Sequence, residues 1–141
     1  MKVFVLDNSV AMRWLLASEK EPDQRYAEVV LRSLVGADAR VPNLWHLEAT
    51  NVLLNAEKRS EVSAGEVERF MAQLENLLTR GDTLTVQQAF GRIMTLSRIC
   101  GLSSYDAACL ELAIREGISL ATLAKGLIEA ANRADVELYL R

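Results

Sequence analysis

The segment Lys2–Ser9, KVFVLDNS, places an acid and two further polar residues directly after a short apolar run. Such a run, bounded by polar residues, is typical of a buried β-strand. A second segment, Ser119–Ala131 with the sequence SLATLAKGLIEAA, predicts a short strand that leads straight into a helix. Between the two, apolar runs alternate with amphipathic segments. This alternation predicts an α/β fold, a three-layer α/β/α sandwich with a central parallel sheet.

The same patterns give the expected elements along the chain. We expect strands at KVFVL, ARVP, DTLTV, ISLAT and VELYL. We expect helices over residues 9–16, 24–35, 43–59, 63–79, 87–99, 104–116 and 125–133. The length of 141 residues fits a single domain, residues 1–141, with a substantial core.

Composition excludes several classes of protein. The net charge of -3 argues against a chain that grips nucleic acid by bulk charge. His46 is the only histidine, which disfavours a His-based zinc site or a Ser-His-Asp triad. Cys100 and Cys109 lack the spacing of a metal site, and reduced, packed thiols are expected. No apolar run is long enough to cross a bilayer and no export signal is present, so we expect a cytoplasmic protein without membrane contact.

Asp7 ends the first predicted strand, where parallel sheets gather their ligands. It is a candidate metal ligand or general base, or alternatively the N-cap of the helix that follows.

Glu48 lies within NLWHLEATNVLLNAEK, a segment that is apolar around most of its circumference. With Asn51 and Asn55 it forms a narrow polar line at helical spacing. A buried carboxylate needs a cation, a hydrogen-bond network or a raised pKa. We therefore expect this line to face a polar cavity, the alternative being a solvated stripe.

Asp106 follows Ser103 at the spacing of a capping box, so it is either a helix cap or a carboxylate that faces the same cleft. Three acids at element junctions or within an apolar helix favour a site for hard divalent cations such as Mg²⁺. A pair of such ions activates water and stabilises an in-line phosphoryl displacement.

The motifs VLDNSVAMRW, HLEATNVL, LSSYDAACLELA and SLATLAKGLIEAA, in this order, resemble the PIN-domain family, specifically VapC-like toxins of type II toxin–antitoxin pairs. The resemblance covers essentially the whole chain. It implies an endoribonuclease that depends on Mg²⁺ or Mn²⁺, a homodimer, and a VapB-like antitoxin whose C-terminal segment lies in the active-site groove. Asp7, Glu48 and Asp106 match the family's three leading acids. Ser9, Asn51 and Thr122 match the polar positions that support them.

The resemblance has one gap. The family's last motif usually carries a fourth Asp directly after the residues that match LATL, and this chain has Ala124 there. We expect ribonuclease activity to be reduced or absent for this reason. The chain is either a naturally weakened enzyme or one that carries an introduced substitution.

Two other classes remain open. A catalytically dead PIN-fold module that binds antitoxin or RNA is favoured by Ala124. A phosphatase of the haloacid dehalogenase-like type needs a second acid two residues after the nucleophilic Asp, and Ser9 occupies that position instead.

Overall fold

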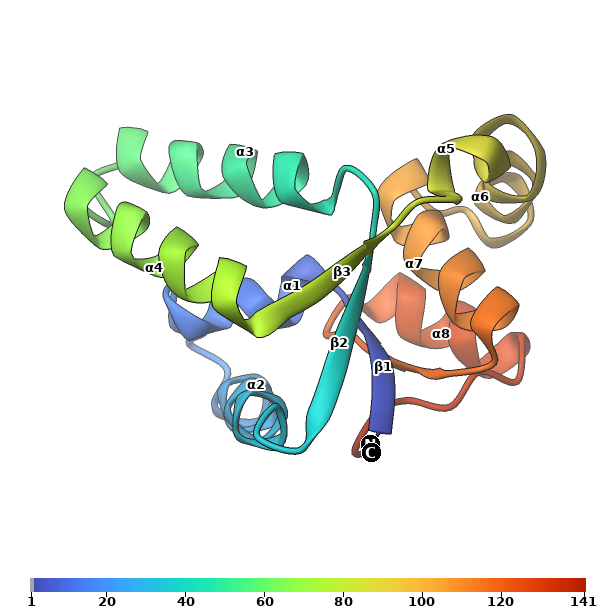
Figure 1. Ribbon diagram of the computed structural model, residues 1–141, viewed down its shortest axis with the longest axis horizontal. Coiled ribbons are helices and arrows are strands. Elements are labelled where there is room, and N and C mark those ends of the chain that lie inside the picture. The colour runs from blue at the N-terminus through green and yellow to red at the C-terminus, as the bar shows by residue number, and fades with distance from the viewer. Residues whose placement is uncertain (1) are drawn as a thin grey trace.

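The computed structural model describes residues 2–141, with the backbone alone for residues 78–80. Its four strands form one sheet in the order β3-β2-β1-β4, and every pairing is parallel. The strands are β1 (Lys2–Leu6), β2 (Ala37–Pro42), β3 (Leu78–Asp82) and β4 (Ser119–Ala121). The first strand therefore lies inside the sheet, with its carboxyl end between two neighbours (Figure 1).

Helices cover both faces of this sheet, as the sequence predicts. One face carries α1 (Asn8–Ala11), the 3₁₀ turn Met12–Trp14, α2 (Glu21–Ser33), α3 (Trp45–Lys58) and α4 (Ala64–Leu77). The other carries α5 (Thr85–Gln88), the π-helical turn Ala89–Ile93, α6 (Met94–Cys100), α7 (Ser104–Glu116) and α8 (Lys125–Arg133). The three-layer α/β/α sandwich is confirmed.

Side chains of β1 alternate between the two cores. Phe4 and Leu6 pack with α1–α4, whereas Val5 packs with α7 and α8, and all three are fully buried. A parallel strand covered on both faces needs apolar residues at every position, which explains the unbroken apolar run. Across the described residues 2–141, no helix has both the length and the apolar character needed to span a bilayer.

Two predicted strands are wrong. The segment DTLTV forms only the last residue of β3 and the start of α5, because Thr85 turns back to donate its hydroxyl to Asp82 Oδ2 at 2.7 Å. The same hydroxyl oxygen accepts the Asn43 N–H at 3.0 Å. The segment VELYL makes a single parallel bridge between Leu138 and Leu120 instead of a strand.

A buried ion cluster fastens the far end of α7 to β3. Arg115 donates to both oxygens of Glu111, at 3.1 and 2.9 Å, and to both oxygens of Asp82, at 3.2 and 2.6 Å. The Glu111 side chain is 1% exposed. A carboxylate so deeply buried depends on its partner, because the desolvation of an unpaired charge is not repaid.

We predict that Arg115→Leu destabilises the fold by about 3–5 kcal/mol, since it leaves Glu111 buried and unpaired. Urea unfolding at neutral pH measures the change. The matched control is Arg25→Leu, which removes an exposed pair with Glu21 of the same i,i+4 spacing and costs less than about 1 kcal/mol. If Arg115→Leu and Arg25→Leu lowered the free energy of unfolding equally, Arg115 would not stabilise the fold by pairing with buried Glu111.

Candidate functional site

Asp7 follows the last residue of β1 and is 4% exposed. Its Oδ2 accepts hydrogen bonds from the hydroxyls of Ser9, at 2.5 Å, and Thr122, at 2.8 Å. Each hydroxyl accepts a backbone N–H in turn, from Leu123 at 2.9 Å and from Ala124 at 3.0 Å. Two chains of polarised donors therefore end on one carboxylate oxygen and stabilise its negative charge.

Glu48 lies in the first turn of α3 and is half-buried. Its Oε1 accepts a hydrogen bond of 2.6 Å from Nδ2 of Asn8. Burial raises the pKa of Glu48, the bond from Asn8 opposes this, and the charge of Asp7 raises the pKa further. The Glu48 carboxylate thus lies close enough to Asp7 to be repelled by it.

Asp106 lies in the first turn of α7. Its backbone N–H donates to the Ser103 hydroxyl at 3.1 Å, so the predicted cap is present. Burial, and then the charges of Asp7 and Glu48, raise the pKa of Asp106 to about 6. Ser103 therefore caps the backbone of α7, whereas the role of the Asp106 carboxylate as a site residue stays a prediction.

The acid cluster, defined as Asp7, Glu48 and Asp106, fits a hydrated hard cation in its chemistry. Mutual repulsion that raises carboxyl pKa values is relieved by a positive ion. Within residues 2–141, however, no three Asp, Glu, His or Cys side chains are already arranged to hold one ion together. Mg²⁺ commonly keeps several waters and takes only one or two carboxylates directly. The cluster is suited to that mode of binding rather than to a closed cage.

The predicted supporting residues divide into two groups. Ser9 and Thr122 contact Asp7 directly, as described above. Asn51 is exposed on α3, one turn beyond Glu48, and its part in the site stays a prediction. The polar line expected along α3 therefore does not face one cavity over its length. Glu48 is half-buried, whereas Asn51 is exposed to solvent.

Two contacts of the acid cluster were not predicted from the sequence. Asn8 is buried and bonds to Glu48, and the Cys109 thiol lies 3.8 Å from Oδ1 of Asp7. Burial, followed by the charges of the acid cluster, raises the pKa of Cys109 well above its usual range, so it is a neutral donor there. Only their positions in the sequence could have indicated these two contacts. Asn8 directly follows Asp7, and Cys109 lies three residues after Asp106 on the same helix.

Ala124 occupies the N-cap position of α8. Its backbone is extended, with φ -72° and ψ 117°, and no side chain caps the helix. Asp, Asn, Ser and Thr are strongly preferred at such a position and Ala is among the poorest residues there. The backbone therefore already has the conformation in which an aspartate would cap α8.

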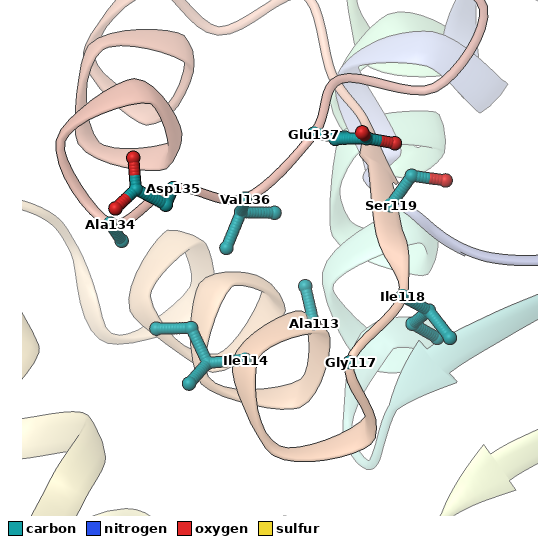
Figure 2. Close-up of a pocket in the computed structure, with 9 residues that line it drawn as sticks. All are labelled: Ala113, Ile114, Gly117, Ile118, Ser119, Ala134, Asp135, Val136 and Glu137. Atoms are coloured by element: carbon teal, nitrogen blue, oxygen red, sulfur yellow. The ribbon is translucent and has the colours of Figure 1, made fainter.

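A cavity of about 360 Å³ lies elsewhere, at the amino end of β4, and is lined by Ile114, Ile118 and Val136 among others. Figure 2 shows Asp135 and Glu137 on opposite sides of this cavity, with their carboxylates well separated. These two acids do not form a second cluster, and the cavity lies away from the carboxyl ends of the strands.

No protein-family model matches the chain, and no curated protein sequence matches it. Solved structures do. PAE2754 from Pyrobaculum aerophilum is similar with a TM-score of 0.67 and 16% identity, over 92% of this chain and 84% of that one. FitAcB from Neisseria gonorrhoeae is similar with a TM-score of 0.60 and 17% identity, over 97% and 96%. At this identity the likeness shows the fold, which is PIN-like.

We predict that Asp106→Asn stabilises the metal-free protein at pH 7.5. The Asp106 pKa of about 6 lies above its ordinary 3.8, so its favourable contribution is complete below pH 4 and is lost as pH rises through 6. Because the side chain is half-exposed, the gain at pH 7.5 is about 1–2 kcal/mol.

Denaturation in EDTA across pH 4–8 measures this difference, which should shrink towards pH 4. A variant less stable than the parent at pH 7.5 would contradict a raised pKa of Asp106.

Proposed function

We propose that this chain has the framework of a metal-dependent endoribonuclease toxin of the VapC type, weakened because Ala124 replaces a fourth acid. The observation that carries the proposal is the grouping of Asp7, Glu48 and Asp106 near the carboxyl end of β1, where burial and then the charge of Asp7 raise the pKa values of Glu48 and Asp106. The PIN-like fold supports it, since PIN domains place their acids at this edge.

In this proposal each residue has a defined task. Asp7, Glu48 and Asp106 hold Mg²⁺ or Mn²⁺, and Ser9 and Thr122 fix the Asp7 carboxylate. A bound cation would supply Lewis acidity, which lowers the pKa of bound water and offsets charge on an RNA phosphodiester. Asp106 must be ionised to take part, so cation binding should weaken as pH falls through about 6.

The geometry at Ala124 supports the loss of a carboxylate rather than a different design. Its N–H is bonded to Thr122, and its backbone has N-cap geometry. Everything that would position an aspartate is therefore in place. An aspartate there would lie at the positive end of the α8 dipole, which favours a negative charge.

We predict that Ala124→Asp creates or strongly increases RNA cleavage that depends on Mg²⁺ or Mn²⁺, because it supplies the missing ligand. Cleavage of structured RNA, followed on denaturing gels with and without EDTA, measures it. Ala124→Asn is the matched control: it caps α8 equally well but adds no charge, so it should not produce comparable activity.

A second candidate function is a binding module without catalysis, which the absence of a carboxylate at Ala124 favours. Adding Glu48→Gln to the Ala124→Asp variant separates the two functions. Loss of cleavage on this change supports the nuclease. If no variant cuts any RNA although Ala124→Asp binds Mn²⁺, the binding module is the better description.

Exposed apolar surface on both sides of the acid cluster supports protein partners, namely a second copy of this chain and a VapB-like antitoxin. The exposed large apolar residues are Leu44, Leu47 and Leu54 at the N-cap of α3 and along it, and beyond β3 they include Val86, Phe90 and Ile99. Phe90 is 93% exposed. Single exposed apolar residues are ordinary, but groups of them mark interaction surfaces.

Charge supports a pairing between the two surfaces. The segment 43–77, which holds α3 and α4, contains six Glu against Lys58, Arg59 and Arg69. The segment 83–105, which holds α5 and α6, contains Arg92 and Arg98 and no acid. The two segments flank the same end of the sheet (Figure 1). In a two-fold dimer, segment 43–77 of one copy would contact segment 83–105 of the other copy. The acidic residues of the first segment would then face the basic residues of the second.

We predict that Phe90→Asp shifts the chain from dimer to monomer, measured by sedimentation at micromolar concentration. Val35→Asp is the matched control, because Val35 is 97% exposed but lies outside both segments. A parent that is already monomeric, or a dimer unaffected by Phe90→Asp, would exclude this interface.

A further inference from the structure

The role of Asn8 is not explained by the tasks given to Asp7 and Ser9 on either side of it. Asn8 opens α1 and is 5% exposed. Its Nδ2 donates to the carbonyl of Trp45 at 3.2 Å and to Oε1 of Glu48 at 2.6 Å. One amide therefore links the start of α1 to the first turn of α3.

Only one orientation of this amide is possible. Reversing it would place Oδ1 against a carbonyl oxygen and a carboxylate oxygen, both of which accept hydrogen bonds. In the orientation that remains, Oδ1 is buried and has no hydrogen-bond partner among the described residues. An unsatisfied buried oxygen lowers stability, so the fold alone does not account for an asparagine here.

Asn8 is well placed to oppose repulsion within the acid cluster. It is joined covalently to Asp7 and by a short hydrogen bond to Glu48, so it ties together two carboxylates that repel each other. Asp7 is also fixed by Ser9 and Thr122. For Glu48, the bond from Asn8 is the side-chain contact that the structure provides within the described residues.

We propose that Asn8 is a positioning residue that holds the Glu48 carboxylate in place for a divalent cation. This inference rests on the proposed function. A hydrogen bond between a metal ligand and a neighbouring side chain fixes the ligand's orientation, and its loss typically lowers metal affinity about 10–100-fold.

The first experiment tests the link itself without metal. Asn8→Ala, Glu48→Ala and the double variant are unfolded in urea at pH 8 with EDTA, where the acids are ionised. Asn8→Ala should lower the midpoint markedly more in chains that keep Glu48 than in chains that carry Glu48→Ala, because only the former lose the bond. Equal shifts in both backgrounds would overturn the inference and leave the proposed function intact.

The second experiment measures Mn²⁺ affinity by electron paramagnetic resonance in the Ala124→Asp background, where three acids remain even after Glu48→Ala. Asn8→Ala should weaken Mn²⁺ binding at least about 10-fold when Glu48 is present, and less than about 2-fold when it is replaced. An equal loss in both backgrounds would overturn the inference, since it would show a general effect on the fold.

Two further variants keep the test decisive. Asn8→Ser replaces Asn8→Ala if the latter does not fold; its hydroxyl is one bond shorter than the amide and falls short of Glu48. Asn132→Ala, on the exposed last turn of α8, should leave Mn²⁺ affinity unchanged. If the folded Ala124→Asp chain binds no Mn²⁺ at all, the proposed function fails, and the positioning role fails with it.

Discussion

Repulsion between three carboxylates at one edge of a sheet is the constraint that shapes this molecule. Asp7 follows β1, Glu48 lies on α3 and Asp106 lies on α7, and burial makes repulsion between such carboxylates stronger than it would be in water. The surrounding donors are arranged against it: two hydroxyls and a thiol on Asp7, and an amide on Glu48. Under the proposed function, a divalent cation would relieve this repulsion, because its positive charge favours the ionised carboxylates.

The rest of the fold compensates for this local loss. Each side of the sheet has its own apolar core, and β1 contributes side chains to both. At the far end of α7, Arg115 pairs with two carboxylates, so that the helix is anchored about two and a half turns from Asp106. Helix α7 is therefore stabilised by ion pairs at Arg115 near its C-terminus and destabilised by like charges at Asp106 near its N-terminus. This division allows a helix terminus to present an acid without being displaced by it.

The sequence predicted what depends on local pattern and missed what depends on tertiary contact. Helices α7 and α8 were predicted over their full lengths, and the Ser103 cap at the start of α7 was part of the local pattern. The strand predicted at DTLTV was wrong because the hydrogen bonds of Thr85 favour a turn into α5 over the extended conformation that β-branched residues prefer. The three acids were predicted, but Asn8 was not, since its partner Glu48 is 40 residues away and no local pattern marks the pair.

Because β1 pairs with β4, the contacts around Asp7 form late during synthesis of the chain. Thr122 lies 115 residues after Asp7, and the N–H groups that complete both donor chains belong to the next two residues. A ribosome adds about 5–20 residues per second, so β1 emerges several seconds before its partners exist. During that interval Asp7 has the hydroxyl of Ser9 nearby but lacks that of Thr122. The contacts of Asp7 are thus completed only after the segment that holds Thr122, Leu123 and Ala124 has been made.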